Sequence, residues 1–166
     1  MNIIIKRHYR IQLPINIEKL ISKLLIKVSQ EHLVGLDSIT LVDHLTYKKN
    51  QKAGGLYWPR KGHEPARIEL AIDTIYSGVP RFVFFLPFVA KFMLAAVLYH
   101  EIGHHYQYFS HGVTKKTEQN FADKYKKRML KKTFFWWRLI MLPFAPLIYL
   151  LKGVTQKRSG KAGRSG

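Results

Sequence analysis

The spacing of apolar residues near the start of the chain predicts one strand followed by one helix. Residues 3–13 mix isoleucines with polar positions and end at Pro14, which is typical of a strand. Asn16 is a residue type that caps helices, and apolar positions then recur at steps of three and four over residues 17–28. Gly35 stands where a glycine that terminates this helix is expected.

Three more strands are predicted before residue 74, separated by turn-forming stretches. Residues 38–45 (SITLVDHL) are rich in β-branched side chains, and the polar run YKKNQKAGG that follows reads as a loop. Residues 56–60 (LYWPR) and 66–73 (ARIELAID) are two further strand candidates, and the latter alternates apolar with polar positions. These segments predict a small sheet with one buried face.

The second half of the chain predicts two helices of different character. Residues 82–109 (FVFFLPFVAKFMLAAVLYHEIGHHYQYF) are mostly apolar, Pro87 suits the first turn of a helix, and Gly112 can end it. Residues 114–130 (TKKTEQNFADKYKKRML) form a polar second helix. The sequence therefore predicts an α+β domain over residues 1–132, in which a small mixed sheet packs on the apolar helix.

A distinct apolar segment, residues 133–151 (TFFWWRLIMLPFAPLIYLL), follows this domain, and a basic, disordered tail is predicted for residues 152–166. The 18 residues 134–151 would be roughly 27 Å long as a helix, close to the ~30 Å core of a bilayer. Arg138 and two prolines oppose a straight span, whereas Trp136 and Trp137 beside basic residues are typical of an interface. We interpret the segment as membrane-associated, by a span or a shallow hairpin; the alternative is a final helix packed over the core.

Composition narrows the possible partners and the possible metal ligands. The 166 residues carry 28 Lys and Arg against 10 Asp and Glu, a formal charge of +18 that favours anionic membranes or nucleic acid. No nucleic-acid-binding motif accompanies this charge, so nucleic acid is the weaker expectation. The chain has no cysteine, which leaves histidine and carboxylate as metal ligands, and its N-terminus lacks a signal peptide's apolar stretch. We therefore expect a cytoplasmic, membrane-associated protein.

The strongest chemical signal is the stretch YHEIGHHYQ, in which His100, Glu101 and His104 fit the pattern H-E-x-x-H. Residues four apart lie one turn apart on a helix, so both imidazoles can reach one metal ion. Glu101 lies about 100° around the helix from His100, where it can accept a proton from a metal-bound water. The pattern predicts a zinc site with Glu101 as general base.

A catalytic zinc commonly has three protein ligands and one open position, so a third ligand is expected downstream. Glu118 is the first choice, because the helix that carries it can fold back against the motif helix. Asp123 is the alternative ligand, or else a partner that orients a ligand histidine through its other ring nitrogen. His111 is a third, weaker candidate.

From residue 17 to residue 132 the order of elements resembles the small gluzincin metallopeptidases, namely the minigluzincins and the ImmA/IrrE-type peptidases. The residues that carry the resemblance are the HEIGH motif and the later EQNFADKY stretch. The resemblance implies a zincin-like fold, zinc ligands at His100, His104 and Glu118, and a general base at Glu101. It also implies that an edge strand before the active helix, residues 66–73 here, binds an extended peptide by strand addition.

Members of that family use a tyrosine or a histidine to stabilise the oxyanion, and the candidates here are His105, Tyr106, His111 and Tyr125. The sequence thus predicts a zinc-dependent metallopeptidase that hydrolyses peptide bonds in a protein or peptide substrate. The alternative is a non-catalytic basic binding or scaffold protein, directed to an anionic membrane or to nucleic acid, that retains a zincin fold.

Overall fold

The structure is a computed structural model, and it describes residues 3–10, 13–47, 51–77, 79, 87–111 and 115–135. The chain divides into two compact units, Met1–Thr133 and Phe134–Gly166, and the fold described below is that of the first. The predicted basic tail, and the predicted apolar segment beyond Phe135, lie outside the described residues. Within the described part of the chain, no helix has both the length and the hydropathy that crossing a bilayer requires.

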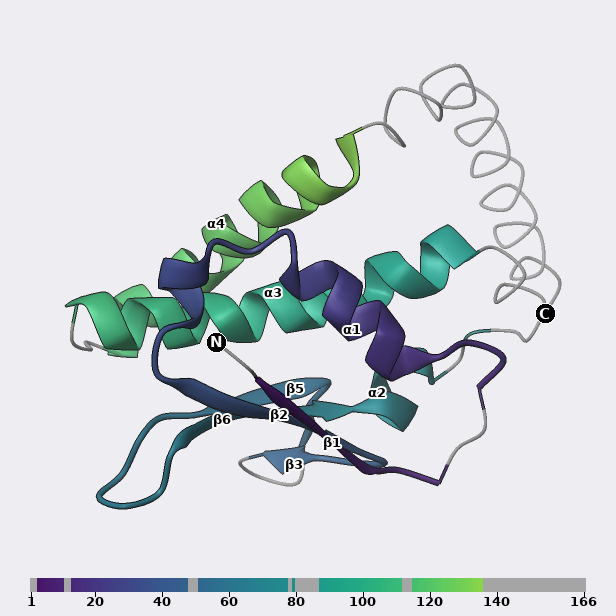
Figure 1. Cartoon of the computed structure of the whole chain (residues 1–166), viewed down its shortest axis with the longest axis horizontal. Coiled ribbons are helices and arrows are strands. Elements are labelled where there is room, and N and C mark those ends of the chain that lie inside the picture. The colour runs from purple at the N-terminus through teal and green to yellow at the C-terminus, as the bar shows by residue number, and fades with distance from the viewer. Residues whose placement is uncertain are drawn as a thin grey trace, which may run out of the picture. The chain divides into compact units, whose positions relative to one another are not determined.

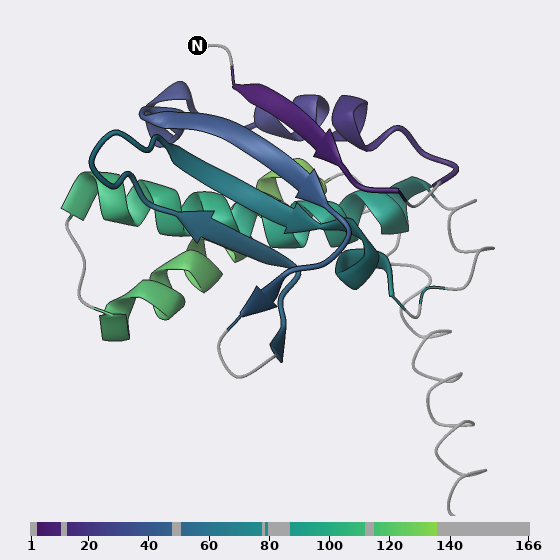
Figure 2. The ribbon, with the colours of Figure 1, turned by 90° about the horizontal axis from the view of Figure 1, so that it is seen from below.

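A four-stranded mixed sheet forms the base of the first unit (Figure 2). Its order is β1 (Ile4–His8), β2 (Leu36–Val42), β6 (Ala66–Ala71) and β5 (Gly55–Trp58). β1 and β6 run parallel to β2, and β5 pairs with β6 in the antiparallel direction. This arrangement confirms the predicted mixed α+β architecture, and it leaves β1 and β5 at the two edges of the sheet.

The position of β6 corrects one expectation from the sequence. The strand predicted at residues 66–73 lies between β2 and β5, so it is an interior strand and β5 forms the edge instead. The predicted alternation along β6 is present: Ile68 and Leu70 are fully buried, while Arg67 and Glu69 are partly exposed. The strand ends at Ala71, because the chain turns there into the short helix α2 (Ile72–Tyr76).

The polar stretch predicted as a loop contains more structure than expected. β3 (Thr46–Tyr47) and β4 (Gln51–Lys52) pair in an antiparallel two-stranded ribbon. β5 begins at Gly55, inside the same predicted loop. The glycines that indicated a turn therefore open an edge strand.

α1 (Ile17–Leu25) begins as the sequence predicts, because the Asn16 side chain accepts a hydrogen bond of 2.7 Å from the Lys19 N–H. The helix buries Ile17, Ile21 and Leu24, which continue the predicted apolar period. Its end differs from the prediction. The N–H groups of residues 27 and 28 bond three residues back, so the chain tightens and leaves the helix before residue 28.

Gly35 does not terminate α1, because the 3₁₀ helix η1 (Gln30–Leu33) lies between them. Gly35 instead precedes β2 with a φ of +83°, a backbone conformation that glycine adopts without a steric penalty. A β-carbon there would also lie 2.8 Å from Cε2 of Phe109 on the longest helix. The prediction that Gly35 terminates the helix over residues 17–28 is therefore wrong.

The two long helices of the unit are α3 (Pro87–His111) and α4 (Lys115–Thr133), and they pack along one another. α3 begins at Pro87 as predicted; Gly112, predicted to follow its end, lies outside the described residues. α1 and α3 lie on the same face of the sheet (Figures 1 and 2). α3 also contacts β5 and η1, so it forms the centre of the core.

Close contact between α3 and α4 depends on a glycine in the histidine motif. A β-carbon added to Gly103 would lie 2.8 Å from the Ala122 Cα and 3.2 Å from the Tyr125 Cβ. The neighbour at 2.8 Å is backbone, which cannot move without displacing the helix. The two helices therefore approach as closely as they do because position 103 has no side chain.

The sign of the change in unfolding free energy caused by Gly103→Ala tests this contact. An exposed helical glycine replaced by alanine gains about 1 kcal/mol of stability. At this site we expect the opposite, a loss of about 1–3 kcal/mol in the free energy of unfolding, because the methyl group overpacks the α3–α4 interface. Urea denaturation of both proteins measures the difference, and a stabilised variant would show that the interface tolerates a side chain.

Candidate metal centre

A cleft of about 1070 Å³ lies beside α3, and it contains the histidine motif. One wall comes from α3, another from the cleft-facing side of α4, and a third from β5 with the residues just before it. The lining side chains that matter for the chemistry are Tyr57, His100, Glu101, His104, Gln119, Asp123 and Lys126. The fold therefore brings the three motif residues into one solvent-accessible space.

The two motif histidines direct the same ring atom at each other. Nε2 of His100 and Nε2 of His104 are 3.1 Å apart, and the two rings are nearly perpendicular, at 87°. Two imidazole nitrogens on one tetrahedral zinc, at Zn–N distances near 2.05 Å, are separated by about 3.3 Å. The spacing of these two nitrogens therefore fits a shared metal ion.

The environment of His100 favours the neutral imidazole that a metal requires. Its side chain is only 17% exposed, and burial, the charge of His104 and the charge of Lys126 together lower the pKa of His100 to about 4. The Asp123 carboxylate acts in the opposite direction but does not offset them. At neutral pH His100 thus holds no extra proton, and a lone pair is available to a metal.

Asp123 lies on the far side of the His100 ring from the shared Nε2 position. Its Oδ1 is 3.2 Å from His100 Nδ1, and it also accepts a 2.7 Å hydrogen bond from the ammonium of Lys126. That hydrogen bond is the main cause that lowers the pKa of Asp123, so the carboxylate is ionised at neutral pH. The contact is within ion-pair distance but is not aligned as a hydrogen bond, since His100 Nδ1 has no hydrogen-bond partner among the described residues. Of the two roles open to Asp123, this position beside the other ring nitrogen is closer to that of a residue that orients a ligand histidine.

The third ligand stays a prediction. Glu118 lies in α4, but its side chain is outside the described residues, and so is the side chain of His111. Among the side chains that the structure describes, no three His, Cys, Asp or Glu come together to hold a metal. Gln119 does line the cleft, one turn before Asp123 on the same face of α4. Position 119 is therefore a second place to test for a ligand, although an amide oxygen binds zinc less readily than a carboxylate.

Glu101 lies against the first residue of β5. Its side chain lines the cleft, although the residue is only 6% exposed. A β-carbon on Gly55 would come within 2.8 Å of Glu101 Cγ, 3.0 Å of Oε1 and 2.7 Å of Val97 Cγ1. Gly54 is less constrained, since its nearest neighbour would be Val97 at 3.4 Å. The missing side chain at Gly55 thus makes room for the predicted general base.

Three of the four oxyanion candidates are held away from the cleft. His105 is buried between the Val34 carbonyl, at 3.0 Å from Nε2, and the Tyr57 hydroxyl, at 3.2 Å from Nδ1. Tyr125 and Tyr106 both contact His32, the first through a 2.9 Å hydrogen bond and the second through its ring. These three residues have packing roles, and the fourth candidate, His111, is not described.

Tyr57 is one of the cleft residues that the sequence did not indicate. It belongs to β5 and lines the cleft, and its hydroxyl meets His105, the residue after the second motif histidine. Nothing in the local sequence marks it among nine tyrosines. The two glycines that precede LYWPR gave the available signal, because adjacent glycines permit close approach of a strand to another element.

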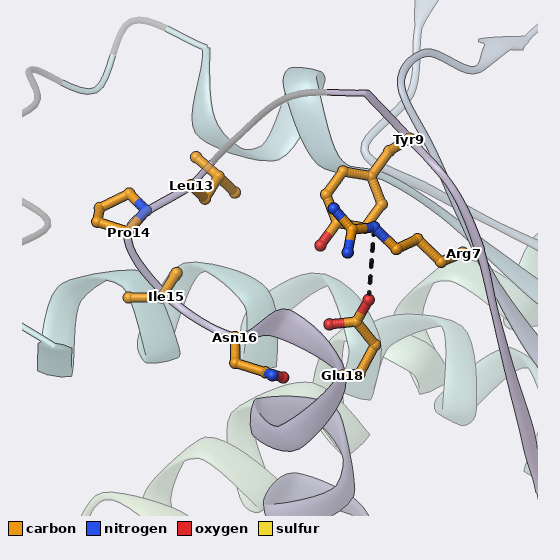
Figure 3. A pocket seen from close by; sticks show the side chains of 7 residues that line it. All are labelled: Arg7, Tyr9, Leu13, Pro14, Ile15, Asn16 and Glu18. Carbon is orange, nitrogen blue, oxygen red and sulfur yellow. Dashed lines mark ion pairs between the residues drawn. The ribbon is translucent and has the colours of Figure 1, made fainter.

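A second pocket, of about 570 Å³, lies at the beginning of α1 (Figure 3). Within it, Arg7 Nε and Glu18 Oε1 are 3.8 Å apart, and the Arg7 guanidinium lies 4.6 Å from the centre of the Tyr9 ring (Figure 3). The opposite charges of Arg7 and Glu18 therefore offset one another in this pocket. The chemistry of the cleft has no counterpart here.

Comparisons with protein-family models, with curated proteins and with solved structures found no match to this chain. The geometry of the cleft is therefore the basis for assigning a function to the chain. Its firmest element is the paired Nε2 atoms of His100 and His104, with Glu101 beside them.

Asp123→Asn tests whether the carboxylate supports His100. Removing such a partner weakens metal affinity by about 10- to 100-fold, because the ring loses its orientation and some basicity. We expect that loss in a competition titration of zinc against a chromophoric chelator. Asp73→Asn is the matched control, since Asp73 contacts His44 rather than a motif histidine. Equal affinities for both variants would assign Asp123 no role at the metal.

Proposed function

We propose that the protein is a zinc-dependent peptidase with a zincin-like fold. The observation that carries the proposal is the 3.1 Å separation of two histidine Nε2 atoms in a cleft that also contains a buried glutamate. His100 and His104 would hold the zinc, with Glu118 as the proposed third ligand. Zinc in such a site lowers the pKa of its bound water to about 7 and polarises a carbonyl oxygen.

Glu101 is the proposed general base. Glu101 lies one residue after His100 on α3 and lines the same cleft, and its side chain leaves the helix about 100° away from that of His100. We propose that it accepts a proton from the attacking water and delivers that proton to the nitrogen of the departing amine. Burial against Gly55 restricts the side chain and so reduces the entropy lost in reaching a reactive geometry.

The proposed substrate is an extended peptide that adds to the edge of β5. Among the described strands, β5 pairs with β6 alone, so its other edge is available for backbone hydrogen bonds. Residues 55–58 of this strand also line the cleft. A peptide paired with β5 would therefore pass beside the two histidines. This assigns to β5 the role that the sequence resemblance assigned to residues 66–73.

A second candidate function is supported by the charge of the chain. A protein with a formal charge of +18 binds anionic surfaces whether or not it has catalytic activity. In that case the histidine motif would serve packing or structural metal binding alone. The two functions differ in their dependence on the Glu101 carboxylate, because zinc binding does not require it.

Glu101→Gln separates the two functions. The amide has nearly the same volume but cannot accept the proton, so we expect cleavage to fall by about 10²- to 10⁴-fold. Zinc content, measured by elemental analysis, should stay at the wild-type level. The assay is hydrolysis of a library of unstructured fluorogenic peptides by the zinc-loaded protein. Cleavage that persists unchanged in this variant would eliminate Glu101 as the base.

Gly55→Ala and Gly54→Ala form a matched pair that tests the placement of Glu101. We expect the first to lower kcat by roughly 100-fold, because a displacement of about 1 Å at a catalytic group has an effect of that size. The second adds the same methyl group in ordinary van der Waals contact and should change kcat less than threefold.

Adding Val97→Ala to Gly55→Ala removes the Val97 contact and leaves the contact with Glu101. We expect this double variant to regain stability in urea denaturation without regaining kcat. A double variant with wild-type kcat would show that Gly55 acts through Val97 and not through the proposed base.

A further inference from the structure

The C-terminal ends of α1 and α4 both contact one side chain of α3, that of Tyr99. The Tyr99 hydroxyl on α3 contacts the Leu24 carbonyl at 3.3 Å and the Thr133 hydroxyl at 2.9 Å. The Lys132 ammonium donates a 3.3 Å hydrogen bond to the Lys27 carbonyl. Three helices that are distant in sequence therefore meet at one place.

This meeting point gathers positive charge. Lys23, Lys27 and Lys132 are all exposed there, and we call these three residues the lysine cluster. In the part of the chain that the structure describes, no ion pair joins any of them to a carboxylate. Burial lowers the pKa of Lys91 on α3, and the charges of Lys23 and Lys27 lower it further, which places those cations near one another.

The first acidic residue after Lys27 in the sequence has other partners. Glu31, which follows the cluster in sequence, contacts the Ser29 hydroxyl at 3.2 Å and His32 Nε2 at 3.4 Å. Cations assembled without a carboxylate repel one another, so the arrangement costs free energy unless an anion is bound. The lysine cluster is therefore suited to a partner that supplies negative charge.

The segment that carries Lys23 and Lys27 also carries an exposed apolar side chain, that of Ile26. Ile26 lies between Lys23 and Lys27 in sequence and is 77% exposed, the most exposed large apolar side chain described in the chain. Lysines that flank an exposed aliphatic residue match a bilayer surface, where headgroups meet the ammonium groups and the apolar group enters the acyl boundary. A phosphate backbone of nucleic acid offers no such apolar phase.

The sequence that follows α4 also favours a membrane surface as the partner. α4 ends at Thr133, directly after Lys132, and the sequence that follows to residue 151 is dominated by aromatic and aliphatic residues. Basic residues immediately before an apolar segment are typical of attachment to anionic membranes.

We propose that the lysine cluster, with Ile26, binds the headgroups of an anionic phospholipid bilayer. Ammonium groups from two helices would contact lipid phosphates while Ile26 enters the interface. Lipid binding by this surface requires no catalysis, so the inference stands or fails separately from the proposed peptidase activity.

The experiment measures partitioning of the full-length protein onto vesicles by sedimentation. The vesicles contain phosphatidylcholine alone, or phosphatidylcholine with about 30 mol% phosphatidylglycerol as the anionic lipid. The test variant is Lys23→Gln/Lys27→Gln/Lys132→Gln. The control variant is Lys6→Gln/Lys52→Gln/Lys61→Gln, which removes the same charge from β1, β4 and the loop before β6. Thermal unfolding confirms that both variants are folded.

We expect the wild type to prefer the anionic vesicles and the test variant to bind them roughly 100-fold more weakly, since each lysine near an anionic surface contributes a factor of about five. The control variant should bind within a few-fold of wild type. Ile26→Ser should weaken binding by roughly fivefold, because it removes apolar area from the interface.

Three results would overturn the proposal. Equal losses in the two triple variants would mean that net charge alone acts, without a defined surface. Equal binding to both kinds of vesicle would assign attachment to the apolar sequence after Thr133. Binding to a 20-base-pair DNA duplex but not to vesicles, lost in the test variant and kept in Ile26→Ser, would identify the lysine cluster as a nucleic-acid surface.

Discussion

The close approach of α3 and α4 at Gly103 is the constraint on which the site depends. With no side chain at position 103, the Ala122 backbone comes near enough for the next residue, Asp123, to reach the His100 ring. His100 and His104, which both line the cleft, direct their Nε2 atoms at each other. The glycine of the HEIGH motif is thus part of the architecture that orients the histidines, as well as a gap that admits a neighbour.

β5 completes the site from the opposite side, and it does so through a second glycine. Gly55 lets the edge strand lie directly on Glu101, which is then buried beside the histidines. One helix pair therefore sets the proposed ligands and one strand contact sets the proposed base. The two contacts involve different residues. Variants of the helix contact should therefore change zinc affinity, whereas variants of the strand contact should change turnover.

Local signals predicted the elements that depend on local chemistry. The Asn16 cap, the start of α3 at Pro87 and the alternation of Ile68 and Leu70 with polar neighbours follow from interactions within a few residues. The order of the sheet could not be predicted in this way, since strand pairing is a long-range choice, and so β6 was wrongly placed at the edge. Tyr57 was missed for the same reason: it borders the cleft only because β5 pairs beyond β6.

The decisive measurement for the proposed metal centre is the zinc content of the purified protein, determined by elemental analysis after reconstitution. We expect one zinc per chain in the wild type and none in His104→Ala. We also expect strongly reduced zinc in Glu118→Gln, with little change in Gln119→Ala, which alters the adjacent residue of α4. A wild-type protein that binds no zinc would rule out the metal centre, because the paired Nε2 atoms would then be a packing arrangement alone.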